Sequence, residues 1–255
     1  MYKIYIILFF LLVLFLLNQK RKENFINNNN IPIYCINLKK SINRWNNTKK
    51  QFNNLNLEIT RFDAVNGANI KINNYLDRIN LDYDTTLNAE CDSKIKPGLK
   101  LKLSNSEIGC ALSHFFVWEK MLTNNINKAL IVEDDIKPYQ KLKDYDKYIS
   151  KMPQDWDIIY ISFINTGTKK YIDKNIYIPS CGFSASGYII NLKGVKKIMK
   201  EIPIRGPLDL FLLELFRKKI INVYVIENLC DASQTWGGQT SQIEHSTRNI
   251  KKFKI

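Results

Sequence analysis

The sequence predicts an α/β fold with a mainly parallel central sheet, preceded by an N-terminal hydrophobic helix. Apolar residues make up 45% of the 255 residues, an ordinary globular composition that excludes a wholly disordered or collagen-like chain. From residue 31 onwards, apolar runs of strand length alternate with segments of helical periodicity, which is typical of sheets joined by crossover helices. An unbroken apolar run also occupies residues 4–17.

The chain is strongly basic, with 38 Lys and Arg against 24 Asp and Glu and a formal net charge of +14. Such a charge suits binding to nucleic acid, to an anionic membrane surface or to an anionic sugar nucleotide. Lys, Asn and Ile are over-used along the whole chain, and no zinc-finger or homeodomain pattern occurs. Compositional bias therefore explains the charge better than DNA binding does, and we expect no nucleic-acid partner.

The five cysteines are too few for a disulfide scaffold. Their odd number leaves at least one outside any intramolecular pair, and the sequence leaves open whether any of them pair. No CxxC spacing occurs, so we do not expect a structural zinc knot.

The apolar run of residues 4–17 predicts a membrane anchor. It is shorter than the span of about 20 residues that a bilayer needs, but Lys3 and the basic residues 20–22 flank it and can extend towards the headgroups. The alternative is a cleaved signal peptide, which is less favoured because no small-x-small cleavage site follows the run.

These features divide the chain into three parts. Residues 1–22 form the expected anchor, residues 23–30 a polar linker with an Asn run, and residues 31–255 the folded domain. We thus predict a single-pass protein that contacts the membrane through residues 4–17. The positive-inside rule taken alone would keep the domain cytosolic, and the side of the membrane stays open.

The first part of the domain reads as strand, helix, strand and a long irregular segment. Residues 31–38 are mostly apolar and predict a buried strand. Ser41 is placed to cap a helix that extends to about residue 55. Residues 59–65 predict a second strand, closed by an Asn-Gly turn. Residues 68–103 are polar, and a segment of that length is typical of a functional loop or a small insertion.

The clearest helix is expected at residues 104–124. Ser104 and Glu107 form a capping box, and an apolar stripe follows at helical spacing. Residues 128–133 then predict a short buried strand. The remaining expected elements are strands at residues 156–162, 184–191 and 222–227 and helices at residues 193–201 and 208–218.

Three acidic residues follow this buried strand: Glu133, Asp134 and Asp135. Ligands of open α/β sheets bind beyond the carboxyl ends of strands. Adjacent carboxylates repel one another unless a cation lies between them, and Mg²⁺ or Mn²⁺ prefers such oxygen ligands. Strand alternation predicts that Glu133 and Asp135 share one side and that Asp134 faces the other. The alternative is a solvated acidic turn.

Two blocks on this helix and strand are specific. Residues 104–114 read Ser-Asn-Ser-Glu-Ile-Gly-Cys-Ala-Leu-Ser-His, and residues 132–135 read Val-Glu-Asp-Asp. Weaker matching segments lie at residues 34–38, 61–67, 156–160, 187–190 and 207–209. Together they resemble glycosyltransferase family 25, which contains lipooligosaccharide galactosyltransferases and procollagen galactosyltransferase domains, over residues 31–247. The resemblance implies a GT-A-like nucleotide-sugar-binding fold, a divalent cation and inverting sugar transfer.

The acidic triplet and its neighbours are the expected donor site. Asp134 and Asp135 are the candidate contacts to Mn²⁺ or Mg²⁺ and to the diphosphate, with Glu133 holding a hydrogen bond beside them. The other candidate substrate-binding residues are Asn37, Arg44, Glu107 and His114. Each of these four has a structural alternative. Asn37 could be a turn amide and Arg44 part of a surface ion pair. Glu107 could only cap the helix, and His114 could be a hydrogen-bonded core histidine.

Inverting transfer needs one base to take the proton of the acceptor hydroxyl. Asp209 is the first candidate because it lies in the first turn of a helix that Pro207 opens. Its structural alternative is an acid that only stabilises the helix start. Glu214, on the same helix, is the second candidate base.

The sequence thus predicts a membrane-tethered, metal-dependent inverting glycosyltransferase. Its donor would be a UDP-hexose, with UDP-galactose implied by the resemblance alone. Its acceptor would be a hydroxyl of a glycan, a lipid-linked sugar or a protein. The alternative is a non-catalytic, membrane-tethered relative that binds a glycan or a partner, and the intact acidic triplet argues against it. A basic nucleic-acid binder is supported only by the charge.

Overall fold

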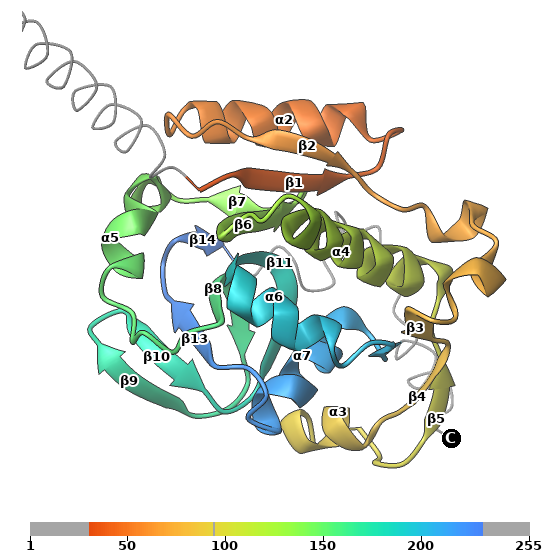
Figure 1. Cartoon of the computed structure of the whole chain (residues 1–255). Helices are drawn as coiled ribbons and strands as arrows, with labels where there is room; N and C mark the ends of the chain where they lie inside the picture. Colours follow the sequence, from red (N-terminus) through yellow and green to blue (C-terminus); the bar gives the residue numbers. More distant parts are fainter. Residues whose placement is uncertain (1–30, 94, 232–255) are drawn as a thin grey trace, which may run out of the picture. The chain divides into compact units, whose positions relative to one another are not determined.

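The computed structural model describes residues 31–93 and 95–231. An eight-stranded sheet forms its centre, in the order β2-β1-β6-β11-β8-β13-β10-β9 (Figure 1). Its strands are β1 (Ile33–Asn37), β2 (Thr60–Asp63), β6 (Lys128–Glu133), β8 (Ile158–Asn165), β9 (Lys169–Asp173), β10 (Ile176–Pro179), β11 (Gly182–Asn191) and β13 (Val223–Ile226). Strands β10 and β11 run against the other six, so the predicted α/β class is confirmed and the sheet is mixed.

The reversed strand β11 lies in the middle of the sheet, between β6 and β8. A parallel neighbour for β8 needs a crossover connection, usually a helix. The chain instead leaves β8 through the strands β9 and β10 and reaches β11 without a helix. Strand β11 therefore pairs antiparallel with β8, and the sequence pattern did not reveal this.

Helices pack on the sheet and bury its apolar side chains. The helices are α2 (Ile42–Asn53), α3 (Thr86–Cys91), α4 (Asn105–Thr123), α5 (Tyr145–Ile149), α6 (Leu192–Met199) and α7 (Leu208–Arg217). Figure 1 shows α4, α6 and α7 in front of the sheet, and one core cluster joins them to it, including Leu112, Trp118, Ile131, Tyr188 and Phe211. Each such side chain contributes about 1.5–3 kcal/mol when fully buried.

Most predicted elements lie within a few residues of their expected bounds. The strand at 128–133 matches β6, and Ser104 and Glu107 form the predicted capping box of α4. Helix α2 begins after Ser41 as expected, but without a capping hydrogen bond from its side chain. The sequence did not predict the strands β9 and β10 or the short helices α3 and α5. Further short elements went unpredicted: β3 (Ile79–Asn80), β4 (Asp82–Asp84), β5 (Lys100–Lys102), β7 (Lys137–Pro138), β12 (Ile204–Arg205), β14 (Cys230–Asp231), η1 (Gly67–Asn69), η2 (Ile72–Tyr75) and η3 (Gln140–Asp144).

The irregular segment of residues 68–103 is a small insertion built from several of these short elements. A disulfide joins Cys91 at the end of α3 to Cys181 just before β11, with their Cα atoms 5.5 Å apart. An ion pair of 2.6 Å between Glu90 and Arg217 adds a second link, to α7. A cross-link across 90 residues stabilises the fold by roughly 4–5 kcal/mol in the chain-entropy view. The remaining cysteines, Cys35, Cys110 and Cys230, are free thiols.

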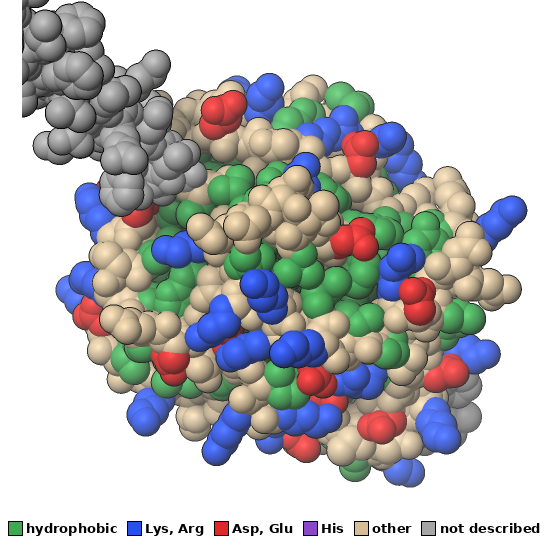
Figure 2. Space-filling view, in the orientation of Figure 1, with side chains coloured by type: hydrophobic (Ala, Val, Ile, Leu, Met, Phe, Trp, Pro, Cys, Tyr) green, Lys and Arg blue, Asp and Glu red, His purple; other side chains and the backbone are tan. Residues whose placement is uncertain are grey.

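The predicted anchor and linker lie outside the described residues, as does the segment from residue 232 to the end of the chain. In the part that the structure describes, no helix has the length and apolarity to cross a bilayer. Figure 2 shows one face of the molecule, on which Lys and Arg side chains are widely spread and interrupted by Asp and Glu.

Candidate active site

The acidic triplet and Asn37 meet at one edge of the sheet. Strands β1 and β6 are parallel neighbours, paired Ile36 to Glu133, so both end at the same edge. There the Asn37 side chain donates hydrogen bonds to Asp134 Oδ2 at 2.5 Å and to the carbonyl oxygen of Ser41 at 3.1 Å. The structure therefore brings together residues that lie almost a hundred positions apart in the chain.

Arg44 of α2 lies against the two aspartates. Its guanidinium nitrogen is 2.5 Å from Asp134 Oδ1 and 2.9 Å from Asp135 Oδ2. The expected alternation, with Asp134 facing away from Asp135, is therefore wrong. Strand β6 ends at Glu133, and the chain then turns. Thr48 donates a hydrogen bond to the Asp134 carbonyl oxygen in this turn at 2.8 Å. The period of two does not extend past the end of the strand.

Two oxygens at this edge are buried and unpaired. Among the described residues, Asp135 Oδ1 and Asn37 Oδ1 have no hydrogen-bond partner. Burial and the charge of Glu133 raise the pKa of Asp135 to about 7 against the opposing effect of Arg44. Burial also raises the pKa of Asp134, although Arg44 and Asn37 oppose the shift. Buried acceptors without donors are costly, and a hard divalent cation is the ligand that would satisfy them. The residues present therefore fit the predicted ion, and Asp135 offers it an oxygen that Asp134 does not.

Arg44 is the counter-charge of this pair, and replacing it tests the electrostatics of the edge. We expect Arg44→Gln to lower the free energy of unfolding by about 2–4 kcal/mol, since it leaves two largely buried carboxylates uncompensated. Urea unfolding in EDTA measures this loss, and added Mn²⁺ should recover much of it. Lys39→Gln is the control, because Lys39 forms an exposed ion pair with Asp63. Equal effects of the two variants would contradict the assignment.

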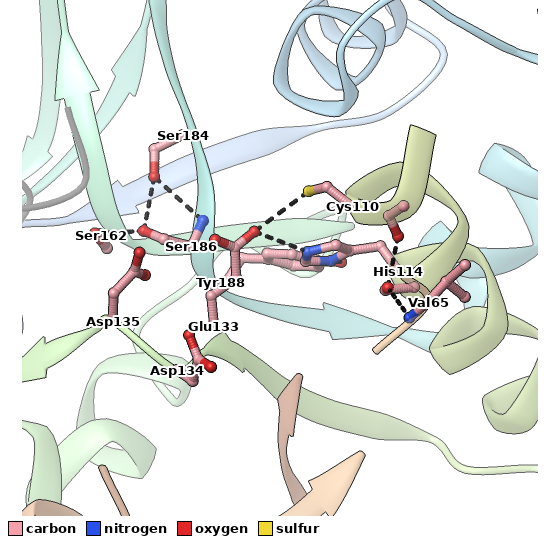
Figure 3. Close-up of polar contacts among 12 residues, drawn as sticks. Val65, Cys110, His114, Glu133, Asp134, Asp135, Ser162, Ser184, Ser186 and Tyr188 are labelled. Carbon is pink, nitrogen blue, oxygen red and sulfur yellow. Dashed lines mark hydrogen bonds and ion pairs between the residues drawn. The ribbon is translucent and has the colours of Figure 1, made fainter. Parts of the chain in front are cut away.

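Glu133 turns towards helix α4 instead. His114 Nε2 lies 3.2 Å from its Oε1, and the Cys110 thiol donates to the same oxygen at 3.5 Å (Figure 3). Burial opposes ionisation of Glu133, but its hydrogen-bonding and electrostatic interactions with His114, the hydrogen bond from Cys110 and the charge of Arg44 outweigh burial and lower the pKa of Glu133. Burial and the charge of Glu133 raise the pKa of the Cys110 thiol. The ligand atoms of the three residues lie within 4.8 Å of one another, so this set too has the composition of a metal site.

The other residues of the α4 block serve packing. A Cβ atom at Gly109 would lie 2.6 Å from the Val65 carbonyl oxygen, so only glycine permits this approach of the chain to the helix. Ser113 accepts a hydrogen bond from the Val65 backbone N–H at 2.8 Å. Positions 109 and 113 thus hold the segment after β2, while positions 110 and 114 face Glu133.

Sequence reasoning missed a row of serine hydroxyls on the two neighbouring strands. Ser186 donates to Ser162 Oγ at 3.0 Å, and the hydroxyls of Ser184 and Ser186 are 2.8 Å apart. Ser184 has a φ of 115°, where the register of β11 against β8 shifts. The sequence signal that could have revealed this row was the alternation of Ser184 and Ser186 along a strand that is otherwise rich in apolar residues. Backbone strain of this kind tends to occur at functional sites.

Asp209 lies in the first turn of α7, as expected. With Tyr160 and Ser184 it lines a cavity of about 10 Å³, room for about one water molecule. Its side chain accepts a hydrogen bond from the backbone N–H of Leu210 at 2.9 Å. The charge of Asp209 is also felt at Cys110, where it adds to burial and to the carboxylate of Glu133 in raising the pKa of the thiol.

Two sequence candidates have mainly structural contacts. Glu107 is buried; its carboxylate accepts from the Ser104 backbone N–H at 2.8 Å, and its own backbone N–H donates to the Ser104 hydroxyl oxygen at 3.2 Å, as a capping box requires. Glu214 forms ion pairs with Arg205 at 3.4 Å and with Lys218 at 2.5 Å. Carboxylates held in this way are poorly placed to bind a sugar or take a proton.

Several known proteins are similar to this chain in sequence. Residues 30–212 match the family described as glycosyltransferase family 25 (LPS biosynthesis protein). A glycosyltransferase 25 family member of Anopheles gambiae is 31% identical over 193 residues, covering 72% of this chain and 31% of the relative. Procollagen galactosyltransferase 2 of Homo sapiens is 27% identical over 204 residues, covering 75% of this chain and 31% of the relative.

The relatives differ in what their names state. A probable inactive glycosyltransferase 25 family member 3 of Bos taurus is 27% identical over 126 residues, covering 45% of this chain and 21% of the relative. The matched region spans about a third of the length of the first two relatives. A family match of this extent establishes descent but not the activity or substrates of the whole protein. The chain belongs to glycosyltransferase family 25.

Proposed function

We propose that the protein is a metal-dependent inverting glycosyltransferase with a GT-A-like nucleotide-sugar site at the edge of β1 and β6. The single observation that carries the proposal is the buried, unpaired Oδ1 of Asp135 beside Asp134 and Arg44. Two carboxylates and a guanidinium at the carboxyl ends of parallel strands suit a cation and a diphosphate. The family supplies the reaction class.

The alternative is a non-catalytic relative, and the family contains a protein named as probably inactive. The same buried acids argue against it here. A site that binds no cation gains nothing from two buried aspartates whose pKa values burial raises, because their ionisation costs stability. If the protein had lost its catalytic role, selection would no longer oppose the replacement of these two aspartates.

The chemistry divides among the described residues. A bound Mn²⁺ or Mg²⁺ would supply positive charge to the diphosphate leaving group. Asp135 would hold the ion through its unpaired oxygen, while Asn37 fixes the orientation of Asp134. Arg44 offers its guanidinium to a phosphate oxygen. Asp209 takes the proton of the acceptor hydroxyl as that oxygen attacks the sugar, and a single displacement of this kind inverts the anomeric carbon.

The donor and acceptor rest on the relatives. We propose UDP-galactose as the donor, because several relatives are named procollagen galactosyltransferases. Hydroxyls of a glycan, a lipid-linked sugar or a protein remain the acceptor classes, with the protein hydroxyl favoured by the same names. No described residue distinguishes galactose from another hexose.

A screen of UDP-sugars by released nucleotide tests the proposal. The full chain in detergent is incubated with each donor and Mn²⁺, with and without a procollagen-derived peptide as acceptor. We expect release from UDP-galactose above the other sugars, and loss of release in EDTA. Nucleotide binding without hydrolysis or transfer from any donor would favour the non-catalytic relative instead.

The predicted anchor gives a further expected result. Deleting residues 1–24 should yield a soluble, folded domain, because the described core begins at Ile33 of β1. Size-exclusion chromatography and circular dichroism measure this. Aggregation of the deletion variant, while the full chain extracts cleanly in detergent, would show that residues 4–17 pack on the domain and do not anchor it.

The disulfide bears on which side of the membrane the domain occupies. Disulfides persist in oxidising compartments and are rare in the cytosol. We propose that the Cys91–Cys181 pair places the domain on the oxidising side, against the positive-inside rule taken alone. Alkylation of the denatured, unreduced protein should then modify three cysteines, and modification of all five would contradict the proposal.

A further inference from the structure

A chain of buried polar groups leads from the core to Glu133. Trp118 and His114 of α4 and Tyr188 of β11 are all fully buried. The Trp118 indole N–H donates to the Tyr188 hydroxyl oxygen at 3.0 Å. The same hydroxyl lies 2.9 Å from His114 Nδ1, and the opposite ring nitrogen of His114 lies 3.2 Å from Glu133 Oε1.

Counting protons fixes the direction of this chain. An indole nitrogen can only donate, so the Tyr188 oxygen accepts from Trp118. The hydroxyl proton then needs an acceptor, and among the described residues only His114 Nδ1 is within hydrogen-bond distance of it. If Nδ1 carried a proton, the hydroxyl proton would be buried without a partner, which is costly. Nδ1 is therefore the acceptor, and the proton of the neutral ring lies on Nε2.

The Nε2–H group then donates to Glu133 Oε1, which also accepts from Cys110. Within the described part of the chain, both hydrogen bonds to the Glu133 carboxylate fall on Oε1. The side chain is 18% exposed at the edge that carries Asp134 and Asp135. The second oxygen, Oε2, is thus left for a ligand at this edge.

We propose that Tyr188 is a positioning residue that holds His114 as the Nε2–H tautomer and thereby directs Glu133 Oε2 at a hydroxyl of the bound sugar. The sugar contact rests on the proposed function, whereas the tautomer does not. Tyr188 touches neither substrate nor cation and acts through His114. The inference also assigns the set Cys110, His114 and Glu133 to hydrogen bonding, although its composition would suit a soft metal ion.

Nitrogen-15 NMR of the imidazole groups tests the tautomer directly on the full chain in detergent, without substrate. The chain has two histidines, and a His245→Asn variant assigns the resonances of His114. We expect a pyridine-type Nδ1 and a protonated Nε2 at neutral pH. Two protonated nitrogens, or a protonated Nδ1 with a bare Nε2, would overturn the proposal. So would an Nε2 resonance that broadens or shifts with stoichiometric Co²⁺ together with a thiolate-to-cobalt absorption band.

Two variants connect the tautomer to function. Tyr188→Phe removes the hydroxyl, and we expect Nδ1-protonated His114 to appear. Trp118→Phe removes only the donor to the Tyr188 oxygen and leaves His114 Nδ1 as the acceptor of the hydroxyl proton, so this variant should keep the wild-type tautomer. Tyr177→Phe is the matched control. Tyr177 lies on β10 and is buried like Tyr188, but its ring contacts the Lys169 ammonium group and is not part of the hydrogen-bond chain that leads to Glu133. The control should keep the wild-type tautomer, and a changed tautomer there would overturn the assignment.

Kinetics distinguishes failure of this proposal from failure of the proposed function. In Tyr188→Phe we expect kcat to fall roughly ten- to hundred-fold, the range for losing an outer hydrogen-bond partner of a functional group. The KM for the nucleotide sugar should change little. His114→Gln keeps an N–H donor near Glu133 and should recover part of kcat relative to His114→Leu. Equal losses of kcat in His114→Gln and His114→Leu would assign His114 to packing alone. If the wild-type protein transfers no sugar, the proposed function is refuted, but the assignment of the tautomer is unaffected.

Discussion

Replacing Asp135 by asparagine is expected to lower turnover by roughly 10³-fold or more, a loss of several kcal/mol of transition-state stabilisation. Asparagine keeps the size of the side chain but removes the charge that would hold a divalent ion. The fold should survive, because burial and the charge of Glu133 already disfavour the ionised Asp135. Nucleotide release with Mn²⁺ measures turnover, and urea unfolding measures stability.

Asp63→Asn is the matched control for this variant. Asp63 ends β2, the neighbour of β1, and forms an exposed ion pair with Lys39. Its loss should leave turnover nearly unchanged. If Asp135→Asn retains turnover, or if the purified wild-type protein is fully active in EDTA, Asp135 does not hold an essential cation.

Replacing Asp209 by asparagine is expected to reduce turnover by roughly 10²–10⁴-fold, the range for a positioned general base. Asparagine also suits the start of a helix, so the fold should be retained. Donor affinity by calorimetry should change little, because Asp209 lines the cavity with Tyr160 and Ser184 and is assigned to the acceptor side.

Glu214→Gln is the comparison for Asp209→Asn. It breaks the ion pairs with Arg205 and Lys218, so it should lower stability more than turnover. Near-normal turnover of Asp209→Asn would assign Asp209 to the helix start and return Glu214 as the candidate base. Loss of donor binding together with turnover would instead place Asp209 in the donor pocket.

Local patterns predicted much of the fold because local physics decides it. The capping box of Ser104 and Glu107 sets the start of α4, and the apolar run of residues 128–133 sets β6. The place of the acidic triplet, directly after a buried strand, was also readable from the local pattern. Such features need no knowledge of distant contacts.

The remainder depends on pairings that no local pattern reveals. The direction of β11 and the Cys91–Cys181 disulfide join residues far apart in sequence. The row of Ser162, Ser184 and Ser186 arises only when β8 and β11 lie side by side. Tyr188 likewise reads as an ordinary core residue until helix α4 brings His114 and Trp118 to its hydroxyl.

Calorimetric titration of UDP into the protein, with and without Mn²⁺, tests the nucleotide-sugar site most directly, since it needs neither an acceptor nor the correct sugar. Wild-type protein should bind UDP at least tenfold more tightly with Mn²⁺ than in EDTA. Asp135→Asn should lose this difference, because the ion would be held by the unpaired Oδ1 of Asp135. Equal affinities in Mn²⁺ and EDTA for the wild type, or a full Mn²⁺ effect in Asp135→Asn, would contradict a cation-dependent site at the edge of β1 and β6.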